Sequence, residues 1–253
     1  MNHEPCDTLK RADMRKILVT VVVTWGALTA AAAHLVRLVG GSPPGSPGQS
    51  ALAAAASLLA AAIAAALPSL LGWMSWAEAG LGRHGASTRR VLWLTASSGL
   101  LCLAAASAMF CITHLIATGS AGTPAQVPAT AVLLQILLVS VPLSAREEIL
   151  FRGPVQYLAN VRMPGRLQVG SLSLRHGTLA IVLGFALVHL VAGGGAPAGF
   201  DLQTWRYLQT GMGGLTGIIF GYVRDETGAV WVPAFLHSLA NASLVILFHL
   251  WPL

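Results

Sequence analysis

The stretch AVLLQILLVSVPLSAREEILFR, residues 131–152, places two adjacent carboxylates, Glu147 and Glu148, directly after an apolar run. A carboxylate at the depth of a bilayer costs roughly 2.5–3.5 kcal/mol on insertion scales, so other groups of the protein must offset that cost. Arg152 follows Glu148 by four residues, and this order favours an ion pair on one helix face. The stretch therefore indicates either the exit of a membrane helix or a polar site inside a membrane protein.

The composition of the whole chain favours a membrane protein. The 253 residues are 55% hydrophobic and only 9% charged, and the mean hydropathy is +0.70. So few polar residues cannot cover the surface of a soluble globule. We expect an all-α, polytopic membrane helical bundle with about seven transmembrane helices, each of roughly 20 apolar residues. The predicted spans are residues 17–36, 51–74, 91–117, 127–144, 177–191, 208–222 and 230–250.

The basic residues alternate between successive loops. They gather in segments 1–16, 83–90 and 162–175, whereas segments 42–49 and 119–128 carry no charge. Because Lys and Arg concentrate in cytoplasmic loops, this pattern predicts a cytoplasmic N-terminus, with Arg37 and Arg206 as exceptions on the outer side. The net charge of +6 is then explained by topology and an anionic lipid bilayer, and it calls for no nucleic-acid partner.

We divide the chain into a cytoplasmic tail (1–16), three N-terminal transmembrane helices (17–126) and a C-terminal core of four (127–253). The first helix resembles a signal peptide in its basic start. Its polar lead is long, however, and its apolar run continues past the candidate cleavage site, so we expect the helix to be retained.

Polar side chains recur inside the later spans. His189 ends the fifth span's sequence FALVH, and the seventh span contains HSLAN, residues 237–241. His237 and Asn241 are four apart, so they share a helix face, whereas Glu147 lies about 100° around its helix from Glu148. Depth along the helices predicts that Glu147, His189, His237 and Asn241 line one cavity, which we expect to open toward the cytoplasm.

Three motifs, in this order along the chain, resemble those of the CPBP family. They are Glu-Glu-x-x-x-Arg at 147–152, Phe-x-x-x-His at 185–189 and His-x-x-x-Asn at 237–241. The family comprises the CAAX prenyl endopeptidases and bacteriocin-processing or immunity proteins, and it is also called the Abi family. The resemblance spans about residues 131–250 and implies an intramembrane endopeptidase with a helical-bundle fold.

The resemblance also implies roles for individual residues. Glu147 matches the catalytic glutamate and His189 its partner in activating water, while His237 and Asn241 match the groups that stabilise the oxyanion. Glu148, Arg152 and Phe185 match supporting positions. These roles agree with peptide hydrolysis, which needs a base for water and donors for the developing negative charge.

The metal requirement stays open at this point. The chain has no His-Glu-x-x-His sequence, the usual helical zinc-protease motif, and we predict a glutamic-type enzyme without a cofactor. The alternative is a zinc enzyme in which Glu147, His189 and His237 bind the metal and water takes the fourth position.

Two functions of other classes are also compatible with the sequence. One is a proton-coupled carrier that uses Glu147 and the histidines as a relay, and the other is a non-catalytic immunity or binding protein. The expected partner of the protease is a membrane-associated protein or peptide, such as a leader peptide, a membrane-anchored precursor or a C-terminal sorting helix. We expect a multi-pass protein of the bacterial inner membrane.

Overall fold

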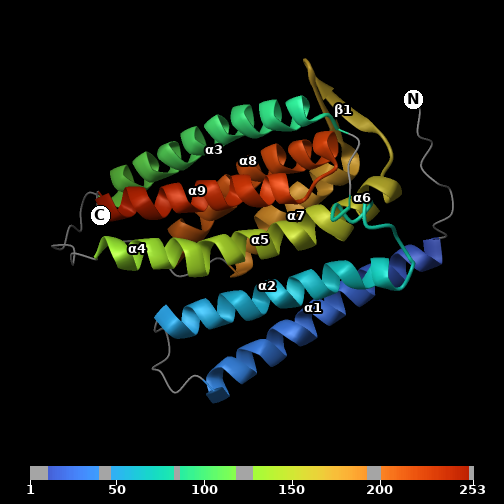
Figure 1. Cartoon of the computed structure of the whole chain (residues 1–253). Coiled ribbons are helices and arrows are strands. Elements are labelled where there is room, and N and C mark those ends of the chain that lie inside the picture. The colour runs from blue at the N-terminus through green and yellow to red at the C-terminus, as the bar shows by residue number, and fades with distance from the viewer. Residues whose placement is uncertain (1–10, 40–46, 83–85, 118–127, 193–200, 251–253) are drawn as a thin grey trace.

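The computed structural model describes residues 11–39, 47–82, 86–117, 128–192 and 201–250, which form a bundle of helices with one small hairpin (Figure 1). The uncharged segments 42–49 and 119–128 lie largely outside these residues. The helices and strands are α1 (Arg11–Val39), α2 (Pro47–Leu70), α3 (Thr88–Ala117), α4 (Ala129–Gln135), η1 (Ile136–Ser140), α5 (Val141–Leu150), η2 (Phe151–Val155), α6 (Gln156–Arg162), β1 (Arg166–Val169), β2 (Leu172–Arg175), α7 (His176–Ala192), α8 (Leu202–Thr227) and α9 (Trp231–Leu250).

The apolar helices are those of an all-α membrane bundle. Among the described residues, four helical stretches are long and apolar enough to cross a membrane: 51–70, 88–116, 129–162 and 231–250. The helix at 176–191 is apolar but shorter. The bundle is therefore confirmed, while the count of seven spans and the cytoplasmic N-terminus stay predictions.

The fourth helical stretch extends far beyond its predicted end at residue 144. It continues through α4, η1, α5, η2 and α6 to Arg162, with a kink at Gly153, so Glu147 and Glu148 lie in its middle rather than at a helix exit. Gly153 has a non-helical backbone (φ −77°, ψ −119°) and precedes Pro154. Proline lacks an N–H and crowds the preceding turn, which explains the kink. The carbonyl of Arg152 instead accepts a hydrogen bond from Arg224 Nε at 2.8 Å.

Helix α8 is also longer than the predicted span 208–222. Asp201 caps its start by accepting a hydrogen bond from the Thr204 N–H at 2.8 Å. Gly228 ends it in the left-handed conformation with φ 72°. Capping chemistry sets helix ends independently of hydropathy, and the hydropathy of α8 falls where Arg206 and Arg224 lie. The prediction therefore missed both terminal turns.

A two-stranded antiparallel hairpin, absent from the prediction, joins α6 to α7. Arg166 pairs with Arg175, and Gly170 supplies the positive φ of 60° that the tight turn requires. The hairpin lies at the end of the bundle where α1, α3, α7 and α9 start and α2, α6 and α8 finish (Figure 1). We call this the hairpin end. The other end, where α2, α4 and α8 start, is called the opposite end.

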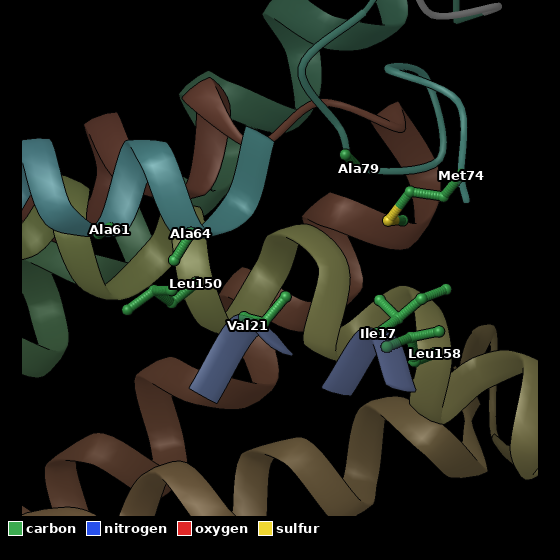
Figure 2. Packing of buried hydrophobic residues seen from close by; sticks show 8 residues of the cluster. All are labelled: Ile17, Val21, Ala61, Ala64, Met74, Ala79, Leu150 and Leu158. Carbon is green, nitrogen blue, oxygen red and sulfur yellow. The ribbon is translucent and has the colours of Figure 1, made fainter. Parts of the chain in front are cut away.

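A buried apolar cluster joins the first two helices to the core. Its members come from α1, α2, the segment after α2, α5 and α6, and they lie close together (Figure 2). They are Ile17, Val21, Ala61, Ala64, Met74, Ala79, Leu150 and Leu158. The alanines allow the helices to approach closely, as small residues do in membrane bundles. This packing brings α1 beside the polar residues of α5.

Candidate functional site

Glu148 is the centre of a buried polar cluster. Its Oε2 lies 3.2 Å from Arg152 Nε, and both side chains have 0% exposure, so the predicted ion pair on one helix face is present. Its Oε1 lies 3.0 Å from Nδ1 of His237 on α9. A buried charge without a partner is strongly destabilising, so this cluster ties α5 to α9.

Arg152 also contacts α7 and α8. Its guanidinium carbon lies 4.9 Å from the centroid of the Phe185 ring, a cation–π distance. Its Nη2 donates to the Gly217 carbonyl at 3.4 Å. A Cβ on Gly217 would lie 3.4 Å from Nη2 and from Val182, so the absence of a side chain lets α8 approach this closely. Arg152 thus holds three helices around one point.

Phe185, predicted as a supporting residue, lies between the two histidines. Its buried ring makes edge contacts with His189 at a centroid distance of 4.7 Å and with His237 at 6.0 Å. Phe151 packs on the same ring at 5.2 Å. The aromatic residue of the second motif therefore orients the histidines of both the second and the third motif.

The hydrogen bond of His189 defines its tautomer. Nδ1 lies 2.9 Å from the carbonyl oxygen of Phe185, which can only accept, so Nδ1 carries the proton and donates. Nε2 is then the ring nitrogen with a lone pair in the neutral form. A Cβ on Gly213 of α8 would lie 3.3 Å from the ring, so this glycine leaves the space that the imidazole needs.

Asn241 has a partner that the sequence analysis did not identify. Its Nδ2 donates to Ser144 Oγ at 2.9 Å, and Ser144 in turn donates to the Ser140 carbonyl at 2.8 Å. Ser144 is 1% exposed. Its position four residues before Glu148, on the same helix face, is the sequence feature that could have identified it.

Glu147 is paired with its neighbour, Arg146. Arg146 Nη2 donates to Glu147 Oε1 at 3.1 Å, and its Nη1 donates to Ser57 Oγ of α2 at 2.9 Å. About a fifth of each side chain is exposed, 22% for Arg146 and 23% for Glu147. No local pattern in the alanine-rich α2 distinguishes Ser57, so this contact could not be predicted.

One cavity of about 540 Å³ brings the four predicted catalytic residues together. Glu147, His189, His237 and Asn241 all line it, together with Ser144, Arg146 and Phe185. The other lining residues are Trp25, Thr29, Met109, Leu143, Val188, Trp205, Gln209, Met212, Gly213, Thr216, Ala240 and Leu244. Most of these lie nearer the opposite end than the motif residues do. The cavity therefore extends away from the arginine-rich loops, whereas the sequence analysis predicted that it opens toward them.

The proposed zinc ligands share this cavity without forming a ligand group. In the described part of the chain, no three His, Cys, Asp or Glu side chains are placed so that they could hold a metal ion. Glu147, His189 and His237 are therefore neighbours around a common space rather than a converging set of ligands.

The comparison with known families agrees with the three motifs. Residues 127–243 match the model of a family described as type II CAAX prenyl endopeptidase Rce1-like. This segment contains all three motifs, and the match confirms the resemblance to CPBP membrane proteases. No match was found among the curated proteins or the solved structures.

Proposed function

We propose that the protein is an intramembrane endopeptidase that hydrolyses a peptide bond in a membrane-associated protein or peptide. The observation that carries this proposal is the single cavity lined by Glu147, His189, His237 and Asn241 within a segment similar to a family of endopeptidases. Such a cavity offers a base for water beside donors for an oxyanion, as amide hydrolysis requires.

In the first step, Glu147 removes a proton from a water molecule in the cavity. The water oxygen attacks the carbonyl carbon of the substrate and forms a tetrahedral intermediate. His189 Nε2 accepts a hydrogen bond from the same water, which agrees with a proton on Nδ1. The salt bridge to Arg146, itself anchored on Ser57, restrains the Glu147 carboxylate.

In the second step, His237 and Asn241 donate hydrogen bonds to the oxyanion. The Glu148 carboxylate accepts a hydrogen bond from His237 Nδ1 and fixes the ring, whose Nε2 is a donor when both ring nitrogens carry a proton. Ser144 accepts one of the two Asn241 N–H groups and leaves the other for the substrate. Glu147 then transfers its proton to the leaving nitrogen, the C–N bond breaks, and a carboxylic acid and an amine are released.

The test compares wild type with Glu147→Gln, reconstituted or in cells that express each form. We expect the variant to fold and to lose about 10²–10⁴-fold in cleavage rate, the contribution of a general base. Glu226→Gln is the matched control, because Glu226 pairs with Arg90 at the hairpin end. The termini of membrane and exported proteins, compared between the two strains, identify the substrate. Unchanged termini would argue against a protease and leave the carrier or the binding protein.

The enzyme is proposed to be metal-free and to lie in the bacterial inner membrane. Among the described residues no three possible ligand side chains are placed to hold a metal ion, and this arrangement supports a glutamic mechanism. Chelation and re-addition of zinc on the purified, active protein decide the question. Stoichiometric zinc that is needed for cleavage would replace this mechanism with a metal-dependent one.

A further inference from the structure

The basic residues of the described chain gather at the hairpin end. Arg89 and Arg90 start α3, and Arg162, Arg166 and Arg175 belong to α6 and the hairpin. At the opposite end the described helices contain Arg37 and Arg206. Lys and Arg near the ends of membrane helices are retained on the cytoplasmic side, which orients the hairpin end toward the cytoplasm.

The site is closed toward the hairpin end. Glu148 and Arg152 have 0% exposure, and Phe185 and Gln156 have 1%. Gln156, one helical turn further toward the hairpin, donates to the Gly221 carbonyl at 3.0 Å and to Thr178 at 3.1 Å. Packed side chains and internal hydrogen bonds therefore separate the cavity from the cytoplasmic loops.

The cavity extends in the other direction. Along α8, the Gly217 carbonyl accepts a hydrogen bond from Arg152, and Gly213, Gln209 and Trp205 line the cavity in the successive turns beyond. Trp205 lies in the first turn of α8, beside its cap at Asp201, roughly 18 Å along the helix from Gly217.

The residues of α9 that line the cavity also continue toward the opposite end. Asn241 and Leu244 follow His237 along the cavity, and Phe248 packs against Trp205. Met109 of α3 also lines this part of the cavity, next to Phe110, which packs on Phe248. The lining residues on α3, α8 and α9 thus all indicate that the cavity extends toward the opposite end.

We infer that the cavity is reached from the extracytoplasmic side, so that the substrate is a segment of a membrane-anchored protein exposed at or beyond the outer leaflet. This inference rests on the proposed function for its substrate class, but the direction of access follows from the charges and the cavity. Partly exposed Thr29 and Gln209 supply polar groups along this path, which suits hydrated peptide backbone inside a membrane protein. The peptide bond that is cleaved then lies in a segment of the substrate that has already been translocated across the membrane.

Thiol labelling of single-cysteine variants tests the direction of access. The three native cysteines, Cys6, Cys102 and Cys111, are first replaced by alanine in the full-length chain. Gln209→Cys then reports on the cavity, and Ser173→Cys on the hairpin. A membrane-impermeant maleimide is applied to right-side-out and to inverted membrane vesicles. Melting of each purified variant and retained cleavage by the cysteine-free form confirm that the fold is intact.

We expect Gln209→Cys to be labelled in right-side-out vesicles and Ser173→Cys only in inverted vesicles. Labelling of Ser173→Cys from outside would overturn the orientation. Failure of Gln209→Cys to react from outside, whether or not it reacts in inverted vesicles, would overturn access from that side.

The substrate class is tested separately through the protein termini that depend on Glu147. Cleavage sites on extracytoplasmic segments support the inference, and sites confined to cytoplasmic segments contradict it while leaving the protease activity established. If no terminus depends on Glu147, the proposed function fails, whereas the labelling result on the direction of the cavity still stands.

Discussion

Glu148 Oε1 lies 3.0 Å from His237 Nδ1, so one buried carboxylate joins the first and third motifs. Because the same carboxylate pairs with Arg152, its position is set by two helices at once. In the proposed mechanism Glu148 therefore acts on the reaction through His237, as a positioning residue. The effect of Glu148 on kcat distinguishes this role from a purely structural one.

We expect Glu148→Gln to lower kcat by about 10–100-fold with little change in KM, as when the group that orients a functional histidine is lost. His237→Ala should cost at least as much. Because Glu148 acts through His237, the double variant should be no slower than His237→Ala alone. Steady-state cleavage of the substrate found by the comparison of termini provides the measurement, and additive losses would contradict this coupling.

Arg152→Met should destabilise the protein by about 3–5 kcal/mol, since it leaves the Glu148 carboxylate buried without its cation. Glu148→Leu combined with Arg152→Met removes both charges and keeps the volume, so it should recover most of the lost stability. Unfolding of the purified protein in detergent measures both effects. A double variant less stable than Arg152→Met would show that the pair stabilises the bundle beyond mutual compensation.

The sequence alone was sufficient to predict the all-α membrane bundle and the ion pair between Glu148 and Arg152. Both depend on local information, namely hydropathy and spacing along one helix. The gathering of Glu147, His189, His237 and Asn241 around one cavity was also predicted, because motif order and helix direction restrict where these residues can meet.

The sequence could not reveal contacts that depend on how the helices pack. Ser57 reaches Arg146 across 89 positions, and nothing in α2 marks it. The continuation of the fourth helical stretch past residue 144 was missed because the hydropathy falls at Arg146, Glu147 and Glu148, which nevertheless belong to α5. The direction of the cavity likewise depends on side chains of α8 that lie outside the motifs.

Gly221→Ala tests the closest approach between α7 and α8. An added Cβ would lie 2.5 Å from Thr178 Cγ2, so the helices must separate, at a cost of about 1–3 kcal/mol for overpacking. Thr178→Ser removes that methyl group and keeps the hydroxyl that donates to Asp225 at 2.6 Å. The double variant should therefore regain stability in thermal unfolding. No recovery would mean that the strain comes from another contact.

Glu78, in the segment between α2 and α3, should make stability depend on pH. Partial burial raises the pKa of its carboxyl group, but hydrogen bonds from Tyr157 and Ser75 outweigh this effect and hold the pKa below its ordinary value. A depressed pKa in the folded state contributes stability above the pKa of the unfolded chain. That contribution is lost as the pH falls through the folded-state pKa.

The measurement is the midpoint of unfolding as a function of pH for wild type and Glu78→Gln. Wild type should be the more stable at neutral pH, and the difference should shrink as the medium becomes acidic below the ordinary range of a glutamate. Glu226→Gln serves as the control for a carboxylate at the same end of the bundle. A difference that persists unchanged into acid would show that Glu78 acts without its charge.

Ser144→Ala tests whether Asn241 must be held in place for catalysis. The variant removes the acceptor of Asn241 Nδ2, and a hydrogen bond of about 0.5–1.5 kcal/mol corresponds to a loss of about 2–13-fold in kcat with little change in KM. Ser238→Ala is the matched control, because Ser238 also donates to a carbonyl of its own helix, at 2.8 Å, whereas Asn241 donates to Ser144. Since Asn241 is the group through which Ser144 acts, Ser144→Ala should have no further effect in an Asn241→Ala background. A loss of the same size in that background would assign Ser144 a role independent of Asn241.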